Sequence, residues 1–372
     1  MGIAQLIILA LAGLSVLLSA VAIRRDVPPD WRFAVPEALP ANGAPRFETV
    51  FDYTAPAGQA HSPSIVLQPD GFDVLWFEGS QEAQADVDIH HAALRRNAGA
   101  WQVTARGERI TRSQLGAASV PRQLVVTLGN TVDNERRSGD VYATVVSVGG
   151  WAMASVADVR MEADGPRSAR KLNLSPFLNR SHLVKSPMVD FADGSLGLPA
   201  YFEMGATHGV LVRLDAEGRV RDTARIAGAG KPIQPMIVPL SETRAIAWLR
   251  DFEPSGRLLV SETRDGGKTW SPVRPLDMPN PSAPVAALNL GQGRIVMVVN
   301  DDPDGADRLS LLVSEDEGQS WQHLRTLEEN GVGARYPVLR RLGADEIALA
   351  YSVGNKQGVR VHVFNAAWLV TQ

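Results

Sequence analysis

Two copies of one octapeptide constrain what this chain can fold into. Residues 263–270 read TRDGGKTW, and residues 314–321, which begin 51 positions later, read SEDEGQSW. In both, an Asp and two hydroxyl residues surround a Gly, a composition that suits a tight turn, because the side chains bond the turn's backbone and Gly supplies a positive φ. The Trp that follows has a large area to bury between neighbouring sheets. A repeat of about 50 residues, built from a strand, a turn and another strand, is typical of β-propeller blades.

Six segments after residue 45 share one plan: a short motif that often contains Pro, an apolar strand, a turn, and a second very apolar strand. They begin near residues 61, 128, 186, 234, 284 and 336. Weaker versions of the octapeptide turn occur at Asn97, Asp164 and Asp215. Strands that are apolar throughout suit sheets packed on both faces. If residues 47–51 complete the last blade, no free edge strand remains. The sequence therefore predicts an all-β fold, a six-bladed β-propeller over residues 46–372, with five blades as the nearest alternative.

The N-terminus is a nearly unbroken apolar run over residues 3–23. As a helix, this run spans roughly 31 Å, which is enough for the hydrocarbon core of a bilayer. The small residues at 20–22 favour a cleaved signal peptide, whereas Arg24 and Arg25, with no basic residue before the run, favour the orientation of an anchor. We expect residues 1–23 to be a signal peptide or membrane anchor, and the protein to be exported, as a periplasmic or membrane-anchored protein of the cell envelope. Membrane contact through this segment is expected if it stays uncleaved. Residues 24–45 contain five Pro and are predicted to be a linker.

Composition excludes several classes of site. The chain has no Cys, so disulfides and thiolate chemistry are excluded. Its net charge is −4 with both signs interspersed, which gives no indication of a nucleic-acid partner. The seven His are scattered, and His90 and His91 are adjacent, so on a strand they face opposite sides and cannot share a metal. We expect no metal, no cofactor and a monomer.

The start of each innermost strand in a propeller faces one mouth of the central channel, where chemistry is expected. The residues placed there by the predicted blades are His61, Asn130, Lys185, Gln234, Ser282, Arg335 and Tyr336. Arg257 and Arg308 each lie six residues before an octapeptide. Two arginines at the same position of adjacent blades could clamp one carboxylate, since guanidinium groups suit bidentate pairing. The alternative is that both are solvated arginines at a sheet edge.

The octapeptide resembles the Asp-box of the sialidase (neuraminidase) superfamily. From residue 46 onward the chain is similar to bacterial sialidase-like proteins of the BNR-repeat type, for example over residues 146–151, 197–203 and 363–369. The resemblance implies a six-bladed propeller in which an arginine triad holds the carboxylate of an acidic sugar. It further implies a Tyr nucleophile paired with a Glu, and an Asp as acid and base.

Carried onto this chain, the resemblance implies that Arg257 and Arg308 belong to the triad and that Tyr336 is the nucleophile. A neutral Tyr suits this role, because the carboxylate of the substrate would repel an anionic nucleophile. Residues 78–89 are similar to the first-blade loop of the family, which makes Asp86 or Glu82 the proton donor, with a raised pKa in a dry pocket. A solvated acidic loop is the alternative.

The chain departs from the family pattern at three positions. Gln81 stands where related proteins often have Arg. His61 stands where a triad arginine is expected, and Gln234 stands where the Glu partner of the Tyr is expected. An amide cannot act as a base. Glu203 as a base, or Arg335 by stabilising the phenolate, could compensate for Gln234. His61, Gln234, Arg335, Glu203 and Arg250 are the candidate substrate-binding residues.

The expected function is a sialidase-like exo-glycosidase that removes a terminal acidic sugar of the sialic acid type. The alternative is a non-catalytic propeller that binds an acidic glycan or a partner in the cell envelope. A third option is the same fold acting on another acidic sugar, by elimination. A carboxyl group with a shifted pKa in the site favours an enzyme, whereas arginines without a positioned acid favour a binding protein. Fold alone does not decide between them.

Overall fold

The computed structural model describes residues 2–25, 28–175, 179–253, 255–302, 305, 307–329 and 331–371. The chain divides into two units, Met1–Asp30 and Trp31–Gln372. The first unit contains α1 (Ile3–Arg25), whose described side chains are exposed. The helix is long and apolar enough to cross a membrane, a property that anchors share with signal peptides. The predicted hydrophobic helix is therefore present. Asp26 and Val27 of the predicted linker lie outside the described residues.

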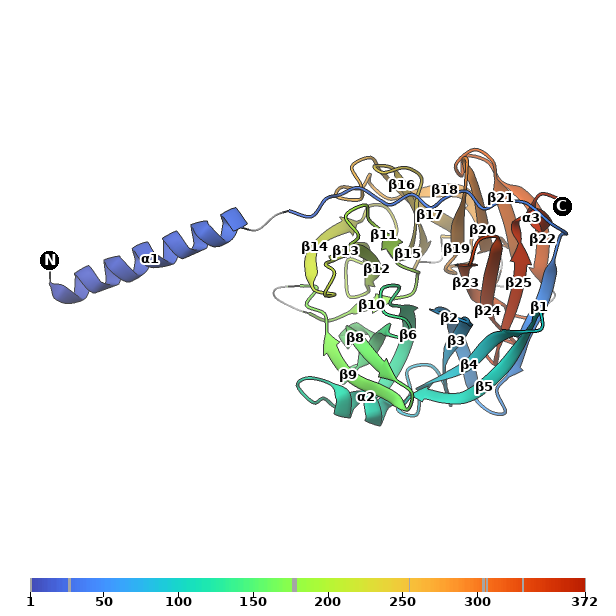
Figure 1. Cartoon of the computed structure of the whole chain (residues 1–372), viewed down its shortest axis with the longest axis horizontal. Helices are drawn as coiled ribbons and strands as arrows, with labels where there is room; N and C mark the ends of the chain where they lie inside the picture. Colours follow the sequence, from blue (N-terminus) through green and yellow to red (C-terminus); the bar gives the residue numbers. More distant parts are fainter. Residues whose placement is uncertain are drawn as a thin grey trace. The chain divides into compact units, whose positions relative to one another are not determined.

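The second unit consists of six antiparallel sheets arranged around a centre (Figure 1), which confirms the six-bladed β-propeller. The strands of each blade are given from the centre outward. Blade 1 contains β2 (Gln59–Gln68), β3 (Gly71–Gly79), β4 (Asp88–Asn97) and β5 (Ala100–Ile110). Blade 2 contains β6 (Thr127–Asp133), β7 (Val141–Val146), β8 (Ser155–Glu162) and β9 (Gly165–Lys171). Blade 3 contains β10 (His182–Val184) with β11 (Val189–Asp190), then β12 (Leu196–Phe202), β13 (His208–Leu214) and β14 (Val220–Ile226).

The second half of the ring repeats this order. Blade 4 contains β15 (Pro232–Pro239), β16 (Ala245–Asp251), β17 (Arg257–Thr263) and β18 (Arg274–Pro279). Blade 5 contains β19 (Ala286–Gly291), β20 (Arg294–Asn300), β21 (Leu309–Ser314) and β22 (Gln322–Glu328). Blade 6 contains β23 (Arg335–Leu342), β24 (Glu346–Val353), β25 (Gly358–Asn365) and β1 (Phe47–Thr54). Short helices follow β5, β7 and β25: α2 (Arg112–Ala118), η1 (Trp151–Met153) and α3 (Ala366–Leu369).

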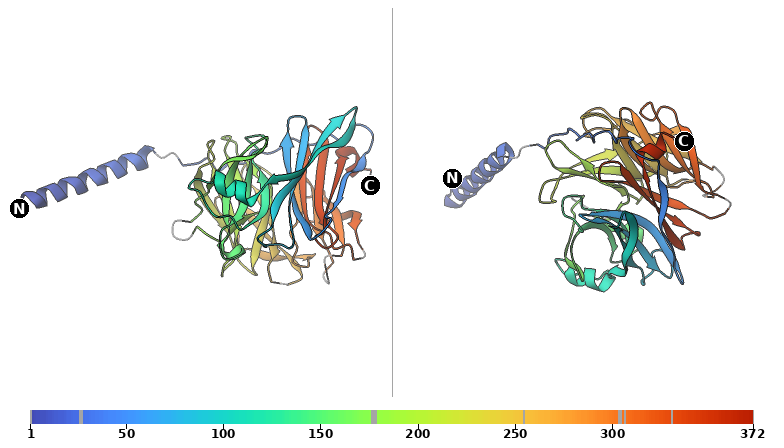
Figure 2. Two further views of the ribbon diagram at one scale, coloured as in Figure 1. Left: turned by 90° about the horizontal axis from the view of Figure 1, so that it is seen from below. Right: turned by 45° about the vertical axis from the view of Figure 1, so that its right-hand side comes forward.

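The ring is closed by the N-terminal strand of the propeller. β1 pairs antiparallel with β25, with Phe47 opposite Phe364, and both figures of the whole chain show the blue β1 beside the red β25 (Figures 1 and 2). The predicted closure by residues 47–51 is confirmed. The first and last strands of the propeller thus belong to one sheet, and this pairing closes the ring.

The octapeptide turns connect the third and fourth strands of their blades. Asp265 accepts hydrogen bonds from the backbone N–H of Thr269 at 2.9 Å and from its hydroxyl at 2.6 Å, and residues 314–321 repeat both bonds. Trp321 packs edge-on against Trp248 of the preceding blade, with ring centroids 5.8 Å apart. The turn therefore has the predicted structural role: its polar residues fix the hairpin and its Trp fills the space between blades.

Residues 31–39, which we call the strap, pack on the propeller. The N–H of Phe33 donates to the carbonyl of Glu242 at 2.8 Å, and the N–H of Leu39 donates to that of Leu290 at 2.9 Å. Both strap side chains are buried, Phe33 completely. Part of the predicted linker therefore belongs to the folded unit, because Phe33 and Leu39 supply apolar surface that its Pro-rich composition conceals.

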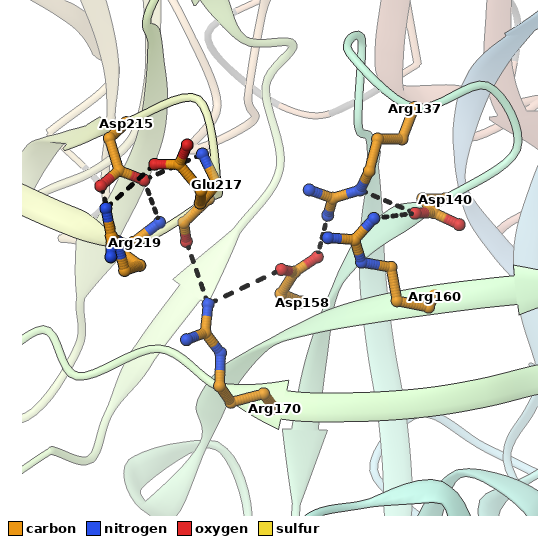
Figure 3. Close-up of polar contacts among 9 residues, drawn as sticks. Arg137, Asp140, Asp158, Arg160, Arg170, Asp215, Glu217 and Arg219 are labelled. Carbon is orange, nitrogen blue, oxygen red and sulfur yellow. Dashed lines mark hydrogen bonds and ion pairs between the residues drawn. The ribbon is translucent and has the colours of Figure 1, made fainter.

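A cluster of ion pairs in blade 2 is linked to the turn of blade 3 by one hydrogen bond (Figure 3). Arg137 pairs with Asp140 at 2.8 Å and with Asp158 at 2.5 Å. Arg170, on the outer strand of blade 2, donates to the carbonyl of Gly218 in the blade 3 turn at 3.3 Å. Each of these charges has a partner within the protein, so the cluster stabilises the contact between the two blades and offers no free charge to a ligand.

Lys185 is a buried lysine at the centre of the ring, between blades 3, 5 and 6. Its ammonium group donates to the main-chain oxygens of Val285 in blade 5 and Pro337 in blade 6. Burial lowers the pKa of Lys185 from 10.5 to about 7. The side chain thus links three blades directly behind Tyr336, the residue that precedes Pro337.

Lys185 makes the stability of the propeller depend on pH. Between pH 7 and 10.5 the folded protein has released the Lys185 proton while the unfolded chain retains it, so the unfolded state binds more protons and stability rises with pH. The contribution is at most about 1.4 kcal/mol per pH unit. We expect Lys185→Met to flatten this rise in the free energy of unfolding, measured by denaturant titration from pH 7 to 10. The exposed Lys268→Met is the control, and an unchanged rise in Lys185→Met would contradict the assignment.

Candidate active site

The innermost strands carry backbone irregularities at one mouth of the channel. The ladders of β2, β15 and β23 shift register near their starts. Ser62, Gln234 and Tyr336 lie inside these bulges, with φ of 55°, 52° and 59°, and Ser282, just before β19, has φ of 55°. A non-Gly residue in this region is unfavourable by roughly 1–3 kcal/mol, and such residues cluster at functional sites. Bulges next to active sites redirect side chains, and here the redirected side chains meet.

Arg250 is the centre of a hydrogen-bond network at this mouth. Its Nη1 donates to the Tyr336 hydroxyl at 3.1 Å and to Gln234 Oε1 at 3.4 Å, and its Nε donates to Ser282 Oγ at 3.1 Å. Gln234 Nε2 in turn donates to the Tyr201 hydroxyl at 3.3 Å. The network joins blades 3, 4, 5 and 6, so the predicted residues Gln234, Arg250 and Tyr336 are brought together.

Two arginines at this mouth, Arg250 and Arg335, form no ion pair with a described residue. Among the residues that the structure describes, no carboxylate lies within the 4.0 Å ion-pair distance of Arg250 or Arg335. The Nε of Arg335 is buried without a hydrogen-bond partner. Guanidinium groups left in this state can receive a carboxylate from a ligand.

Arg257 and Arg308, the predicted carboxylate clamp, already have partners in the protein. Arg257 begins β17 and forms an ion pair with Asp277 on β18, the outermost strand of blade 4. Arg308 directly precedes β21 and donates from Nε to Asp301 at 2.7 Å, a bond that raises the pKa of Arg308. Both arginines lie at third strands, whereas Arg250 is near the end of a second strand. The structure brings neither into contact with Tyr336.

His61 lies against Tyr336 but does not act as a cation. The ring centroids are 4.4 Å apart at 68°, and neither ring nitrogen of the fully buried His61 has a hydrogen-bond partner among the described residues. Burial, followed by the charges of Lys356, Arg335 and Arg250, holds the pKa of His61 well below its usual range. The imidazole is therefore neutral and cannot replace the charge of the arginine expected at this position.

A cavity of about 40 Å³ opens beside Tyr336. It is lined by Glu82, Asn130, Thr144, Trp151, Leu183, Tyr201, Glu203, Gln234 and Tyr336. Four of the predicted site residues, Glu82, Glu203, Gln234 and Tyr336, thus share one small space. Its wall combines apolar and polar side chains.

The two carboxyl groups of the cavity differ in environment. Glu82 forms an ion pair of 2.6 Å with Lys356. Glu203 has no ion pair or side-chain hydrogen bond among the described residues. Burial raises the pKa of Glu203, the nearby charge of Glu82 adds to this shift, and Arg250 opposes it. A carboxyl group with a raised pKa in a cavity is a candidate acid.

Asp86 is not in the environment expected of a proton donor. Its carboxylate is exposed and accepts hydrogen bonds from the backbone N–H and the hydroxyl of Ser80, each at 3.0 Å. The hydroxyl bond lowers the pKa of Asp86, whereas a raised pKa was expected. The reason is that the loop lies in solvent and fixes its own carboxylate. Within the described residues, no three His, Asp or Glu side chains gather as a metal-binding group.

Tyr201 and Lys356 were absent from the predicted site. Tyr201 lies on β12, opposite Leu183 of β10, and its hydroxyl accepts a hydrogen bond from Gln234 of the next blade. Lys356 lies in the turn between β24 and β25 with φ of 75°, and it reaches Glu82 of blade 1. Both contacts cross between blades, so no local sequence pattern indicates them.

Comparison with known proteins agrees with this architecture. A family model for the BNR repeat-like domain matches residues 71–347. A sialidase of Micromonospora viridifaciens is 27% identical over 183 residues, which are 44% of this chain and 26% of that protein.

Solved structures of sialidases share the fold. A Hadza microbial sialidase superposes with a TM-score of 0.64 at 15% identity, over 84% of this chain and 66% of that one. The Trypanosoma rangeli sialidase, in its covalent intermediate with 2,3-difluorosialic acid, gives a TM-score of 0.58 at 13% identity, over 82% and 54%. The chain thus spans less than two thirds of the length of these three proteins. Because the family model covers most of the chain, this propeller belongs to the BNR repeat-like domain family and has a sialidase-like fold.

Proposed function

We propose that this protein is a sialidase-type exo-glycosidase that removes a terminal acidic sugar from a glycoconjugate. One observation carries the proposal: the guanidinium of Arg250, without a carboxylate partner among the described residues, donates to the Tyr336 hydroxyl at 3.1 Å. A free cation beside a nucleophile suits a substrate whose carboxylate is attached to the reacting carbon. The membership of the family and the sialidase-like fold support the same reaction class.

In the proposed reaction, Arg250 and Arg335 bind the carboxylate of the sugar, and the Tyr336 oxygen attacks the anomeric carbon. The hydrogen bond from Arg250 favours the negative charge that develops on the Tyr336 oxygen. Water then displaces the tyrosine and releases the sugar. Both steps need a carboxyl group to carry protons.

A second candidate function is the binding of an acidic glycan without catalysis. Gln234 favours it, because the amide beside Tyr336 cannot accept a proton. The exposed Asp86 with its lowered pKa favours it too. Release of the fluorophore from an aryl α-sialoside by the full-length chain supports the enzyme. Binding of sialic acid without release supports the binding protein.

We also propose that the protein acts outside the cytoplasm. The support is α1, whose length and hydropathy are those of a signal peptide or membrane anchor. Acidic glycans on the cell surface or in the surroundings of the cell are then the accessible substrates. A periplasmic or membrane-anchored location both fit this proposal.

Arg250→Ala should weaken the binding of sialic acid by about 10- to 100-fold, because a charge-assisted hydrogen bond to the ligand is lost. Isothermal titration with the full-length chain measures the Kd. Arg257→Ala is the matched control, since Arg257 is paired with Asp277 away from the cavity and should leave the Kd within about twofold. Equal loss in both variants, or loss only in Arg257→Ala, would show that the ligand lies elsewhere.

A further inference from the structure

The groups around the Tyr336 hydroxyl include no effective proton acceptor among the described residues. Arg250 donates to this hydroxyl, and Gln234 carries an amide. His61 is adjacent, but its pKa lies well below its usual range, so protonating it is unfavourable. A tyrosine that attacks carbon must nevertheless release its proton, and the departing alcohol must gain one.

Three carboxyl groups could supply this chemistry, and their contacts separate them. Asp86 is held by Ser80 in an exposed loop. Glu82 is held by Lys356 in an ion pair of 2.6 Å, so its carboxylate already has a partner. Glu203 is the remaining carboxyl group, and no described residue hydrogen-bonds or pairs with its side chain.

The backbone places Glu203 at the site. It directly follows β12, and its N–H donates to the carbonyl of Ser181 at 3.1 Å, which fixes the start of the loop. Its side chain lines the same cavity as Tyr336 and Gln234. Arg250 and Glu82 both influence its ionisation, which places its carboxyl group in the field of the site. Burial penalises the charged form of Glu203 and so raises its pKa.

We infer that Glu203 is the proton donor and proton acceptor of the reaction, in place of the first-blade loop and of Gln234. This inference rests on the proposed glycosidase function. The protonated Glu203 gives its proton to the glycosidic oxygen as the bond to the anomeric carbon breaks. The Tyr336 oxygen forms the new bond to that carbon, and the phenol proton returns Glu203 to its acid form through one water.

The second half of the reaction balances in the same way. A water molecule attacks the anomeric carbon, the bond to the Tyr336 oxygen breaks, and the proton of the water reaches that oxygen through Glu203. Every proton that one group releases is taken up by another, so no further reactant is needed. Glu203 thus both donates and accepts a proton, whereas the amide of Gln234 can do neither.

The test compares two substrates whose leaving groups differ in their need for a proton: an aryl α-sialoside and an alkyl-linked sialoside such as sialyllactose. In Glu203→Gln we expect kcat/KM for the alkyl-linked substrate to fall on the order of 10²–10⁴-fold. The aryl substrate should lose at least tenfold less, because a phenolate leaves with little protonation. Asp86→Asn is the matched control and should change both values by less than about threefold. A thermal melt of each variant checks folding.

The outcomes separate this inference from the proposed function. If the wild type hydrolyses both substrates and Asp86→Asn shows the selective loss while Glu203→Gln does not, Glu203 is not the proton carrier and the glycosidase proposal stands. Equal loss on both substrates in a folded Glu203→Gln also overturns the role. If Glu203→Gln unfolds, the folded Glu203→Asp variant takes its place. The inference then requires that Glu203→Asp lowers kcat/KM for the alkyl-linked substrate more than for the aryl substrate. No turnover by the wild type overturns both proposals.

Discussion

Tyr336→Phe should lower kcat for an aryl α-sialoside on the order of 10³-fold or more and leave the Kd for sialic acid within a few-fold. The phenol oxygen is the atom that the proposed reaction joins to the sugar, and Phe lacks it. The binding groups Arg250 and Arg335 remain in place, since their charges do not depend on this hydroxyl. Initial rates and isothermal titration on the full-length chain measure the two quantities.

Tyr201→Phe is the matched control for this prediction. Tyr201 lines the same cavity, is equally aromatic, and loses only one hydrogen bond with Gln234 when its hydroxyl is removed. We expect this variant to keep more than about a tenth of the wild-type kcat, in line with the roughly 0.5–1.5 kcal/mol of a single neutral hydrogen bond. Activity that survives in Tyr336→Phe and disappears in Tyr201→Phe would transfer the nucleophile role away from Tyr336.

Phe33→Ala should lower the free energy of unfolding of the propeller by about 3–5 kcal/mol. The Phe33 ring is completely buried and stacks at a tilt on Phe191, with centroids 5.0 Å apart. Its removal leaves a cavity between the strap and blade 3, and the surrounding strands cannot collapse into it. Denaturant titration followed by intrinsic fluorescence measures the loss.

Val35→Ala, also in the strap, is the control for Phe33→Ala. Val35 is 42% exposed, so its truncation should change stability by no more than about 0.5 kcal/mol. Similar small effects of both substitutions would mean that the strap does not contribute to the fold. We expect a truncated protein that begins at residue 46 to be less stable than the complete chain. Equal stability of the two would likewise contradict a role of the strap in the fold.

Local turn chemistry and the repeated apolar strands together were sufficient to predict the propeller. The bonds of Asp265 and Asp316 with the hydroxyl residues that follow them are encoded within eight residues and set the 51-residue repeat, while the six apolar strand segments give the number of blades. Closure by β1 followed from the need to cover an edge strand. The strap was mistaken for a linker because the burial of Phe33 depends on the assembled blades 3 and 4 and leaves no periodic pattern in the sequence.

The candidate residues on the innermost strands lie together as the sequence predicts, whereas the two arginines chosen by counting back from the octapeptides lie at third strands. Tyr336 and Gln234 occupy the bulges of β23 and β15, which the start motifs identified. Counting back from the octapeptide selected Arg257, which lies on the third strand of blade 4. Its ion-pair partner, Asp277, lies on the outermost strand of that blade. Arg250, which the sequence analysis named as a candidate substrate-binding residue, lies on the second strand of blade 4 opposite Ile233. The environment of Asp86 depends on the fold of an exposed loop, which composition does not specify.

The most direct test of the central claim is to incubate the full-length chain with 2,3-difluorosialic acid, the compound held covalently by the Trypanosoma rangeli sialidase, and to map the product by mass spectrometry. Fluoride leaves without protonation, so the result does not depend on Glu203 as a proton donor. We expect one sialyl adduct on the peptide that contains Tyr336, and none in Tyr336→Phe. A chain that binds sialic acid but forms no adduct, or forms it on another residue, would contradict a glycosidase that uses Tyr336 as its nucleophile.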